Sequence, residues 1–327
     1  MELEIFILTY NRQSTLINSI QSILCQTYSK FNLIILDNNS NYDVQGLVNS
    51  FNDDRISVIK NESNIGPVEN YAKAIKLASK DLVMVFHDDD TLPENFIECQ
   101  LLLFSKFKDA GFIVSGINLT TAENSEYNED DTLKYIYFSE RGQMLKCFYD
   151  FPTFGASSIM FKTEVAKKGI YGYEYFGNVV DRMILLNCSS QYPFVYMINP
   201  KYNALQHADQ DSSNRNWSFE YDISLANLFL KNLEDFKLFS YSFKVVKSIS
   251  EFYVYSRKRI SLFETLNKIN FRSRSYMFYF ILLIPRLYIK SIVIKIIKKY
   301  FLNFFIKLNH RKYENKLLKS DQNIVME

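Results

Sequence analysis

Short apolar runs alternate with segments of helical spacing over the first third of the chain. Runs rich in β-branched and aromatic residues occupy five stretches, 3–9, 31–37, 56–59, 82–86 and 112–117. Between them, apolar residues recur at helical spacing in 16–24 and 68–75, and Pro67 and Pro93 mark two helix starts. Strands that alternate with helices in this way predict right-handed crossovers and a mainly parallel sheet, which is an α/β fold.

The remainder of the chain changes character twice. Residues 120–145 are polar and acidic and predict a connection, after which residues 147–215 return to a mixed apolar and polar pattern. From about Trp217 onward glycine is absent and the pattern is helical. We therefore divide the chain into three segments, namely 1–117, 118–215 and a helical C-terminal extension at 216–327.

Polar residues gather where three of the predicted strands end. The clusters lie at 9–12, 37–40 and 87–90. Because the carboxyl ends of parallel strands meet at one edge of a sheet, ligands bind beyond that edge. This edge is the predicted binding site, and it collects one arginine with several carboxylate and amide side chains.

Asp88, Asp89 and Asp90 are the sharpest chemical signal in the sequence. They follow an apolar strand, where carboxylates can hold a hard divalent cation such as Mn²⁺ or Mg²⁺. A solvated acidic loop with an aspartate helix cap is the alternative interpretation. The nine scattered glycines form no phosphate-binding loop. A phosphatase of the haloacid dehalogenase type is also disfavoured, because its threonine would stand one position early, at Thr91.

Cysteine content and apolar runs limit the compartment. The four cysteines, at positions 25, 99, 147 and 188, form no Cys-x-x-Cys pair, which favours buried thiols over zinc or disulfides. The first residues lack the basic start and the long apolar run of a signal peptide. No stretch is apolar enough for a good spanning helix. These features predict a cytoplasmic or peripheral protein.

A basic block lies near the C-terminal end. Residues 265–313 contain eleven lysines and arginines and no acidic residue, interleaved with isoleucine, leucine, phenylalanine and tyrosine. Such a block favours an anionic partner. Lysine stems and aromatic rings suit an anionic membrane interface, whereas the apolar interleaving is poor for nucleic acid. A packed helical tail with a basic outer face is the remaining interpretation.

Four motifs together resemble the family 2 glycosyltransferases of the GT-A fold. They are Thr9-Tyr10-Asn11-Arg12, Asp37-Asn38-Asn39-Ser40, Asn64-Ile65-Gly66 and Asp88-Asp89-Asp90, in the appropriate strand context. The resemblance implies that 1–117 is the nucleotide-sugar-binding half of a GT-A domain and that 118–215 is its acceptor-binding half. It implies a metal-dependent transfer of a sugar from a nucleotide diphosphate to an acceptor hydroxyl, with inversion.

The resemblance also assigns roles to single residues. Asp90 and Asp88 would bind the metal, Arg12 would lie near the diphosphate, and Asp37 would contact the nucleobase or ribose. The residues placed at the nucleotide sugar are Thr9, Asn11, Arg12, Asp37, Asn39, Asn64, Gly66, Asp88, Asp89 and His207. The segment placed at the acceptor is Gly155, Ala156 and Ser157. His87 is expected to pack or to support the loop rather than to bind the metal.

A transferase also needs a base that accepts the proton of the acceptor hydroxyl. The resemblance points to an acidic residue ahead of an apolar helix, which here is Asp181, with Glu174 in reserve. An aspartate favoured by the helix dipole is the plain structural interpretation of Asp181. Val180 stands where the family commonly has glutamate, so a non-catalytic nucleotide-sugar-binding protein on the same fold is the alternative function.

The resemblance and the basic block together imply a role in the assembly of surface polysaccharide or glycolipid. The expected partners are a nucleotide diphosphate sugar, a glycan or polyprenyl-linked acceptor and an anionic membrane surface, without nucleic acid. The expected location is cytoplasmic, peripheral on the inner face of the plasma membrane.

Removal of the basic block tests the membrane expectation. A protein truncated after Glu264 should bind the nucleotide sugar normally but lose its attachment to vesicles that contain phosphatidylglycerol. The reason is that each cation near an anionic surface contributes about 1 kcal/mol. Sedimentation with such vesicles measures the attachment. Equal, salt-insensitive pelleting of the full-length and truncated proteins would identify the block as a packed helical cover.

Overall fold

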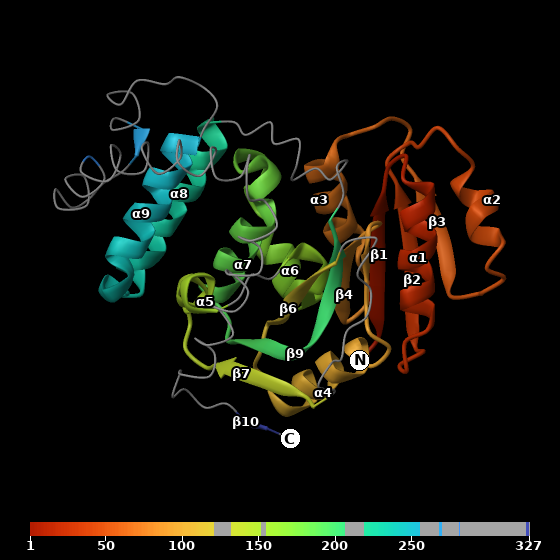
Figure 1. Ribbon diagram of the computed structural model, residues 1–327, viewed down its shortest axis with the longest axis horizontal. Helices are drawn as coiled ribbons and strands as arrows, with labels where there is room; N and C mark the ends of the chain where they lie inside the picture. The colour runs from red at the N-terminus through yellow and green to blue at the C-terminus, as the bar shows by residue number, and fades with distance from the viewer. Residues whose placement is uncertain are drawn as a thin grey trace, which may run out of the picture.

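One mixed sheet with helices on both faces organises the protein (Figure 1). The computed structural model describes residues 1–120, 132–151, 155–206 and 219–255, with short pieces at 268–269, 281 and 325–326. Within these residues ten strands form the sheet, in the order β10-β7-β9-β6-β8-β4-β1-β2-β3, and β5 pairs with β9 beside this path. The predicted α/β class is confirmed.

The amino-terminal half of the sheet is parallel. Its elements are β1 (Leu3–Thr9), α1 (Gln13–Leu24), β2 (Phe31–Asp37), α2 (Val44–Asn49), β3 (Ile56–Lys60), α3 (Pro67–Leu77) and β4 (Leu82–His87). β1 lies between β2 and β4, and β3 pairs with the outer side of β2. Each predicted strand and helix of this half is present. Helix α2 was not predicted, because six residues are too few to show a helical period.

The second half adds antiparallel strands to the same sheet. Its elements are β5 (Asp90–Thr91), α4 (Phe96–Lys106), β6 (Phe112–Thr120), β7 (Lys134–Phe138), α5 (Met144–Asp150), β8 (Met160–Lys162), α6 (Thr163–Gly169), α7 (Val180–Ser189) and β9 (Phe194–Leu205). Strand β8 is antiparallel to both β4 and β6. Strand β9 runs parallel to β6 and antiparallel to β7. Most paired residues still belong to parallel pairs, as predicted.

The expected connection at 120–145 is corrected in part, because it contains strand β7. Its five residues pair with β9, and the Phe138 ring stacks on Phe194 with 4.5 Å between the ring centroids. The segment is short, and its strand character depends on the edge that β9 offers. Residues 121–131 of the expected connection lie outside the described part of the chain.

Two hydrophobic cores cover the two faces of the sheet. Successive strand residues point to opposite faces. In β4, for example, Met84 belongs to one core and its neighbours Val83 and Val85 to the other. Helices α1 and α4 pack into the first core, while α3, α6 and α7 pack into the second. Strands buried on both faces explain the continuous apolar runs in the sequence.

The described part of the C-terminal extension is helical, as predicted. Helices α8 (Phe219–Asp235) and α9 (Ser242–Tyr255) lie side by side at the end of the molecule opposite α2 (Figure 1). Their apolar residues join the core of α5 and α7, and the Tyr149 hydroxyl donates to Ser248 Oγ at 2.9 Å. A two-residue strand, β10 (Val325–Met326), pairs with β7 and differs from the helical expectation.

Most of the basic block at 265–313 lies outside the described residues. Among the helices that the structure describes, none combines the length and the apolar character that a membrane crossing requires. Cys99, Cys147 and Cys188 are buried free thiols, as predicted, whereas Cys25 is exposed.

Truncation of a buried side chain of α8 tests whether this helix belongs to the core. Leu233 is fully buried, so Leu233→Ala should lower the free energy of unfolding by about 2–5 kcal/mol through loss of burial and creation of a cavity. The exposed neighbour Lys231 provides the control, and Lys231→Ala should change it by less than about 0.5 kcal/mol. Denaturant unfolding measures both. Equal, small effects would mean that α8 contributes little to the core.

Candidate active site

The loops that follow β1, β2 and β4 meet at one edge of the sheet. The Asn38 amide donates to the Thr9 carbonyl at 2.9 Å, and the Asn61 amide donates to the Asp37 carbonyl at 2.8 Å. Backbone hydrogen bonds therefore continue past the strand ends into the loops. The three predicted polar clusters come together, because parallel strands place their carboxyl ends side by side.

Asp88 is held by residues of the loop after β1. The Thr9 hydroxyl donates to Asp88 Oδ2 at 2.7 Å, and the Arg12 guanidinium donates to Asp88 Oδ1 and to Asp89 Oδ2, each at 3.2 Å. Burial raises the pKa of Asp88, and the Arg12 charge and the Thr9 hydrogen bond act against that rise. Arg12 thus stabilises two buried carboxylates while its side chain keeps 22% exposure toward solvent.

Asp37 presents an unpaired carboxylate oxygen. Its Oδ1 accepts from the Ser40 amide at 2.8 Å. Its Oδ2 is buried and has no hydrogen-bond partner within the described part of the chain, although the Lys60 ammonium group lies 3.8 Å away. A buried acceptor of this kind is costly unless a partner binds it.

Two asparagines at the edge adopt left-handed backbone conformations. Asn11 has φ 57° and Asn39 has φ 70°, a region that asparagine tolerates better than most residues. The Asn11 amide donates to Ser40 Oγ at 3.0 Å, and Asn11 Oδ1 accepts from the Asn41 amide at 2.8 Å. In this structure the predicted Asn11 therefore ties two loops together.

A network of asparagine side chains shapes the loop before α3. Asn38 Nδ2 donates to Asn64 Oδ1 at 2.8 Å, and Asn64 Oδ1 also accepts from the Gly66 amide at 2.8 Å. Asn38 Oδ1 accepts from Asn61 Nδ2 and from the Ile65 amide, each at 2.9 Å. Gly66 has φ 85°, which glycine adopts without strain. Sequence reasoning found Asn64 and Gly66 but missed the supporting roles of Asn38 and Asn61.

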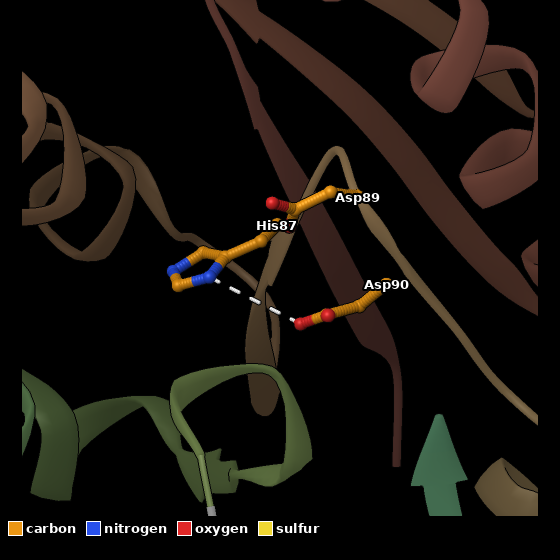
Figure 2. Close-up of side chains that lie close together, drawn as sticks. All are labelled: His87, Asp89 and Asp90. Carbon is orange, nitrogen blue, oxygen red and sulfur yellow. Dashed lines mark ion pairs between the residues drawn. The ribbon is translucent and has the colours of Figure 1, made fainter. Parts of the chain in front are cut away.

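His87, Asp89 and Asp90 form a group that could hold a cation (Figure 2). One ligand atom from each lies within 4.8 Å of the others. His87 Nδ1 and Asp90 Oδ2 are 4.0 Å apart. Figure 2 shows the side chains of Asp89 and Asp90 both extending toward the His87 ring. The two carboxylates suit Mn²⁺ or Mg²⁺, and the imidazole is a donor that zinc and other transition metals also accept.

The position of Asp90 gives its carboxylate unusual properties. The residue begins β5 and pairs with Ala204 of β9, and its carbonyl accepts from Ser19 Oγ at 2.7 Å. Burial raises the pKa of Asp90 to about 7; the His87 charge lowers it and the Asp89 charge raises it. A buried carboxylate without a full counter-charge fits a divalent cation.

The predicted acceptor segment lies against the end of β4. Residues Ala156–Ser158 form a single helical turn, η1, and Ser157 Oγ accepts from the His87 amide at 3.0 Å. A Cβ added to Gly155 would stand 1.8 Å from the hydroxyl of Tyr202. Close packing of Tyr202 is therefore a structural reason for glycine at this position.

Tyr202 is a buried residue whose pKa depends on the charges of the aspartate cluster and of the predicted base. Its pKa is raised by burial and then by the charges of Asp90, Asp181 and Asp89. The charges of Asp90 and Asp181 therefore act on the same buried tyrosine. Asp181 is half-buried in the first turn of α7. Sequence reasoning missed Tyr202, which carries no signal in the sequence beyond its place in an apolar strand.

Two predicted residues remain, Glu174 and His207. Glu174 is exposed, and its charge contributes to the raised pKa of Lys76, which lies in the last turn of α3. His207 lies outside the described residues.

Comparison with known proteins gives a consistent picture. The model of the family described as Glycosyl transferase family 2 matches residues 4–169, about half of the chain. The chain is 32% identical over 98 residues to the UDP-Glc:alpha-D-GlcNAc-diphosphoundecaprenol beta-1,3-glucosyltransferase WfgD of Escherichia coli, covering 30% of this chain and 39% of that one. It is 30% identical over 146 residues to the enzyme of the same activity, WfaP, of Escherichia coli, covering 41% and 57%. The chain thus covers less than two thirds of these relatives.

A solved structure supports the fold. The crystal structure of TarS 1-349 from S. aureus in complex with UDP has a TM-score of 0.57 to this chain. The match covers 83% of this chain and 78% of that one, at 14% sequence identity. At this identity the likeness concerns the fold.

Protonation of Asp90 should compete with a cation. Because the pKa of Asp90 is raised to about 7, Mn²⁺ should raise Tm more at one pH unit above this value than at one unit below it. Asp90→Asn should remove both the rise in Tm and its pH dependence, whereas Asp54→Asn, at an exposed aspartate, should keep them. Thermal unfolding with and without Mn²⁺ measures this. An Asp90→Asn protein that responds like wild type would exclude Asp90 as a ligand.

Proposed function

The chain belongs to glycosyl transferase family 2, and we propose that it transfers a sugar from a nucleotide diphosphate to an acceptor hydroxyl with inversion. The proposal rests on one observation above the others. The ends of two neighbouring parallel strands, β1 and β4, bring Thr9, Arg12 and Asp88 into hydrogen-bond contact at the edge where such sheets bind ligands. In this proposal residues 1–117 bind the nucleotide sugar and residues 118–215 bind the acceptor.

The nucleotide would lie over the loops after β1 and β2. The unpaired Oδ2 of Asp37 can accept a hydrogen bond from the nucleobase or the ribose. Arg12, which donates to Asp88 and Asp89, would place its positive charge near the diphosphate. The loop that contains Asn64 and Gly66 would form the floor of the nucleotide-sugar site, and Asn39 would lie beside this loop. Relatives named for UDP-Glc and a TarS structure with UDP support a uridine diphosphate sugar.

A divalent cation would be held by Asp90, with Asp89 and His87 beside it. Asp88 was also expected to bind the metal, and its two oxygens accept from Thr9 and Arg12, so we assign it mainly to the sugar-donor side. When bound, Mn²⁺ or Mg²⁺ would offset the charge that develops on the leaving diphosphate. Hydrogen bonds hold the surrounding loops in place, and the loops would in turn set the position of the diphosphate.

Asp181 would accept the proton of the acceptor hydroxyl. Asp181 is half-buried in the first turn of α7 and its charge, like that of Asp90, raises the pKa of Tyr202, whereas Glu174 is exposed; this difference supports Asp181 as the base. The hydroxyl would approach past Gly155, Ala156 and Ser157, which lie against Tyr202 and the His87 amide. Deprotonation as the bond forms makes the hydroxyl a competent nucleophile.

The acceptor would be a glycan carried on a polyprenyl diphosphate. Two relatives are named for diphosphoundecaprenol-linked substrates, and the basic block suits an anionic membrane surface. We therefore propose a peripheral enzyme at the cytoplasmic face of the membrane, active in the assembly of surface polysaccharide. His207 would contribute to the sugar-donor site.

A ligand screen tests the proposed donor class. Thermal unfolding with UDP-, GDP- and dTDP-sugars, each with and without Mn²⁺, should show the largest rise in Tm for a UDP-sugar with Mn²⁺. Binding without transfer to any lipid-linked acceptor would favour a non-catalytic nucleotide-sugar-binding protein. Full turnover in EDTA would contradict the cation site.

Removal of the base tests the mechanism. Asp181→Asn should lower the transfer rate by about two to four orders of magnitude, because the acceptor proton loses its base, while affinity for the nucleotide sugar is unchanged. Glu174→Gln is the matched control and should keep the rate. Rates with a soluble acceptor analogue, and binding by titration, provide the measurements. A product whose anomeric configuration is retained, seen by NMR, would contradict single displacement.

A further inference from the structure

The segment that leads into α7 has little local support of its own. It consists of two single-turn helices, η2 (Tyr173–Tyr175) and η3 (Gly177–Val179). Gly172 has φ 81° and Gly177 has φ 49°, and the cap residue of α7, Val179, provides no side-chain hydrogen bond. Short helical turns are weak in isolation. Contacts from elsewhere must therefore fix the first turn of α7.

Tyr173 provides such contacts. Its hydroxyl donates to Glu69 Oε2 at 2.6 Å and accepts from Lys76 Nζ at 3.1 Å. Lys76 Nζ also lies 4.6 Å from the centre of the Tyr173 ring, a cation–π distance. Tyr173 is 6% exposed, whereas its neighbours Tyr171 and Tyr175 are 87% and 70% exposed. One of three nearby tyrosines is thus fixed from two positions on α3.

Helix α3 connects this contact to the sugar-donor loop. Glu69 lies in the first turn of α3, directly after Gly66, whose amide belongs to the asparagine network. The same helix packs against η2 and η3. It also carries Tyr71, whose buried hydroxyl has no hydrogen-bond partner within the described residues and whose pKa is raised by burial and, less strongly, by the charge of Asp181. Helix α3 therefore contacts both the sugar-donor loop and the segment before α7.

We propose that Tyr173 is a positioning residue that, through Glu69 and Lys76, holds the first turn of α7 against α3 and so sets Asp181 relative to the sugar-donor site. This inference rests on the proposed role of Asp181 as the base. The three side chains contact one another rather than Asp181. They affect the rate through the position of Asp181, since a misplacement of a catalytic group by about 1 Å can lower a rate about a hundredfold.

Tyr173→Phe tests the proposal because it keeps the ring beneath Lys76 and removes the hydroxyl. We expect kcat to fall by about ten- to a hundredfold, with KM for the nucleotide sugar unchanged. Tyr171→Phe removes the same group at an exposed position and should leave both constants unchanged. Glu69→Ala, at an exposed helix position, should lower kcat in the same way, and Glu69→Gln, which keeps an acceptor, should restore it. If Tyr173→Phe fails to fold, the pair of Glu69 variants decides the outcome.

A double-mutant comparison separates positioning from general stabilisation. In the Asp181→Asn protein, Tyr173→Phe should cause no further loss of rate, because the group that it positions is gone. An equal loss in both backgrounds, or a lower Tm with kcat unchanged, would overturn the inference. If Asp181→Asn by itself kept the wild-type rate, the proposed base would be wrong and the inference would fail with it. If only the Tyr173 and Glu69 variants kept the rate, the base would stand and the inference alone would fail.

Discussion

Burial of three consecutive carboxylates at the end of β4 is the constraint on which the site depends. Asp88, Asp89 and Asp90 are each at most 8% exposed, and buried charges are costly unless they are paired. Arg12 and Thr9 satisfy the first two. The third retains a raised pKa of about 7. The carboxylates on the side of β1 thus have hydrogen-bond partners, whereas Asp90, on the side of β9, lacks a full counter-charge. This difference favours a cation beside Asp90.

The surrounding loops maintain this arrangement through amide side chains rather than through glycine. Asn11 joins the loops after β1 and β2, and Asn38 joins the loop after β2 to the start of α3. The Asn38 side chain both donates and accepts, whereas Asn11 accepts through its side-chain oxygen and donates through its backbone amide, so each residue joins two segments. A site built in this way is ordered before it binds a ligand, which reduces the entropy lost on binding.

The second half of the protein brings its contribution across the sheet and across α3. Strand β9 places Tyr202 against Gly155, where the charges of Asp90 and Asp181 raise its pKa, and η2 places Tyr173 against Glu69 and Lys76. Tyrosine suits both positions, because its ring packs and its hydroxyl bonds. The packing of the second half against the first thus involves aromatic side chains, which make up 16% of the chain.

The sequence by itself determined the architecture of the first half and the positions of its polar clusters at strand ends. Apolar runs buried on both faces identify parallel strands, and the position of Thr9, Asp37 and Asp88 at strand ends is a local property of the chain. Only the tertiary structure decided which carboxylate pairs with Arg12, and that His87 joins Asp89 and Asp90. It also decided that Tyr173 and Tyr202 lie beside elements distant in sequence. Such contacts arise from packing between elements, and a tyrosine in an apolar pattern looks the same whether its hydroxyl meets a carboxylate or solvent.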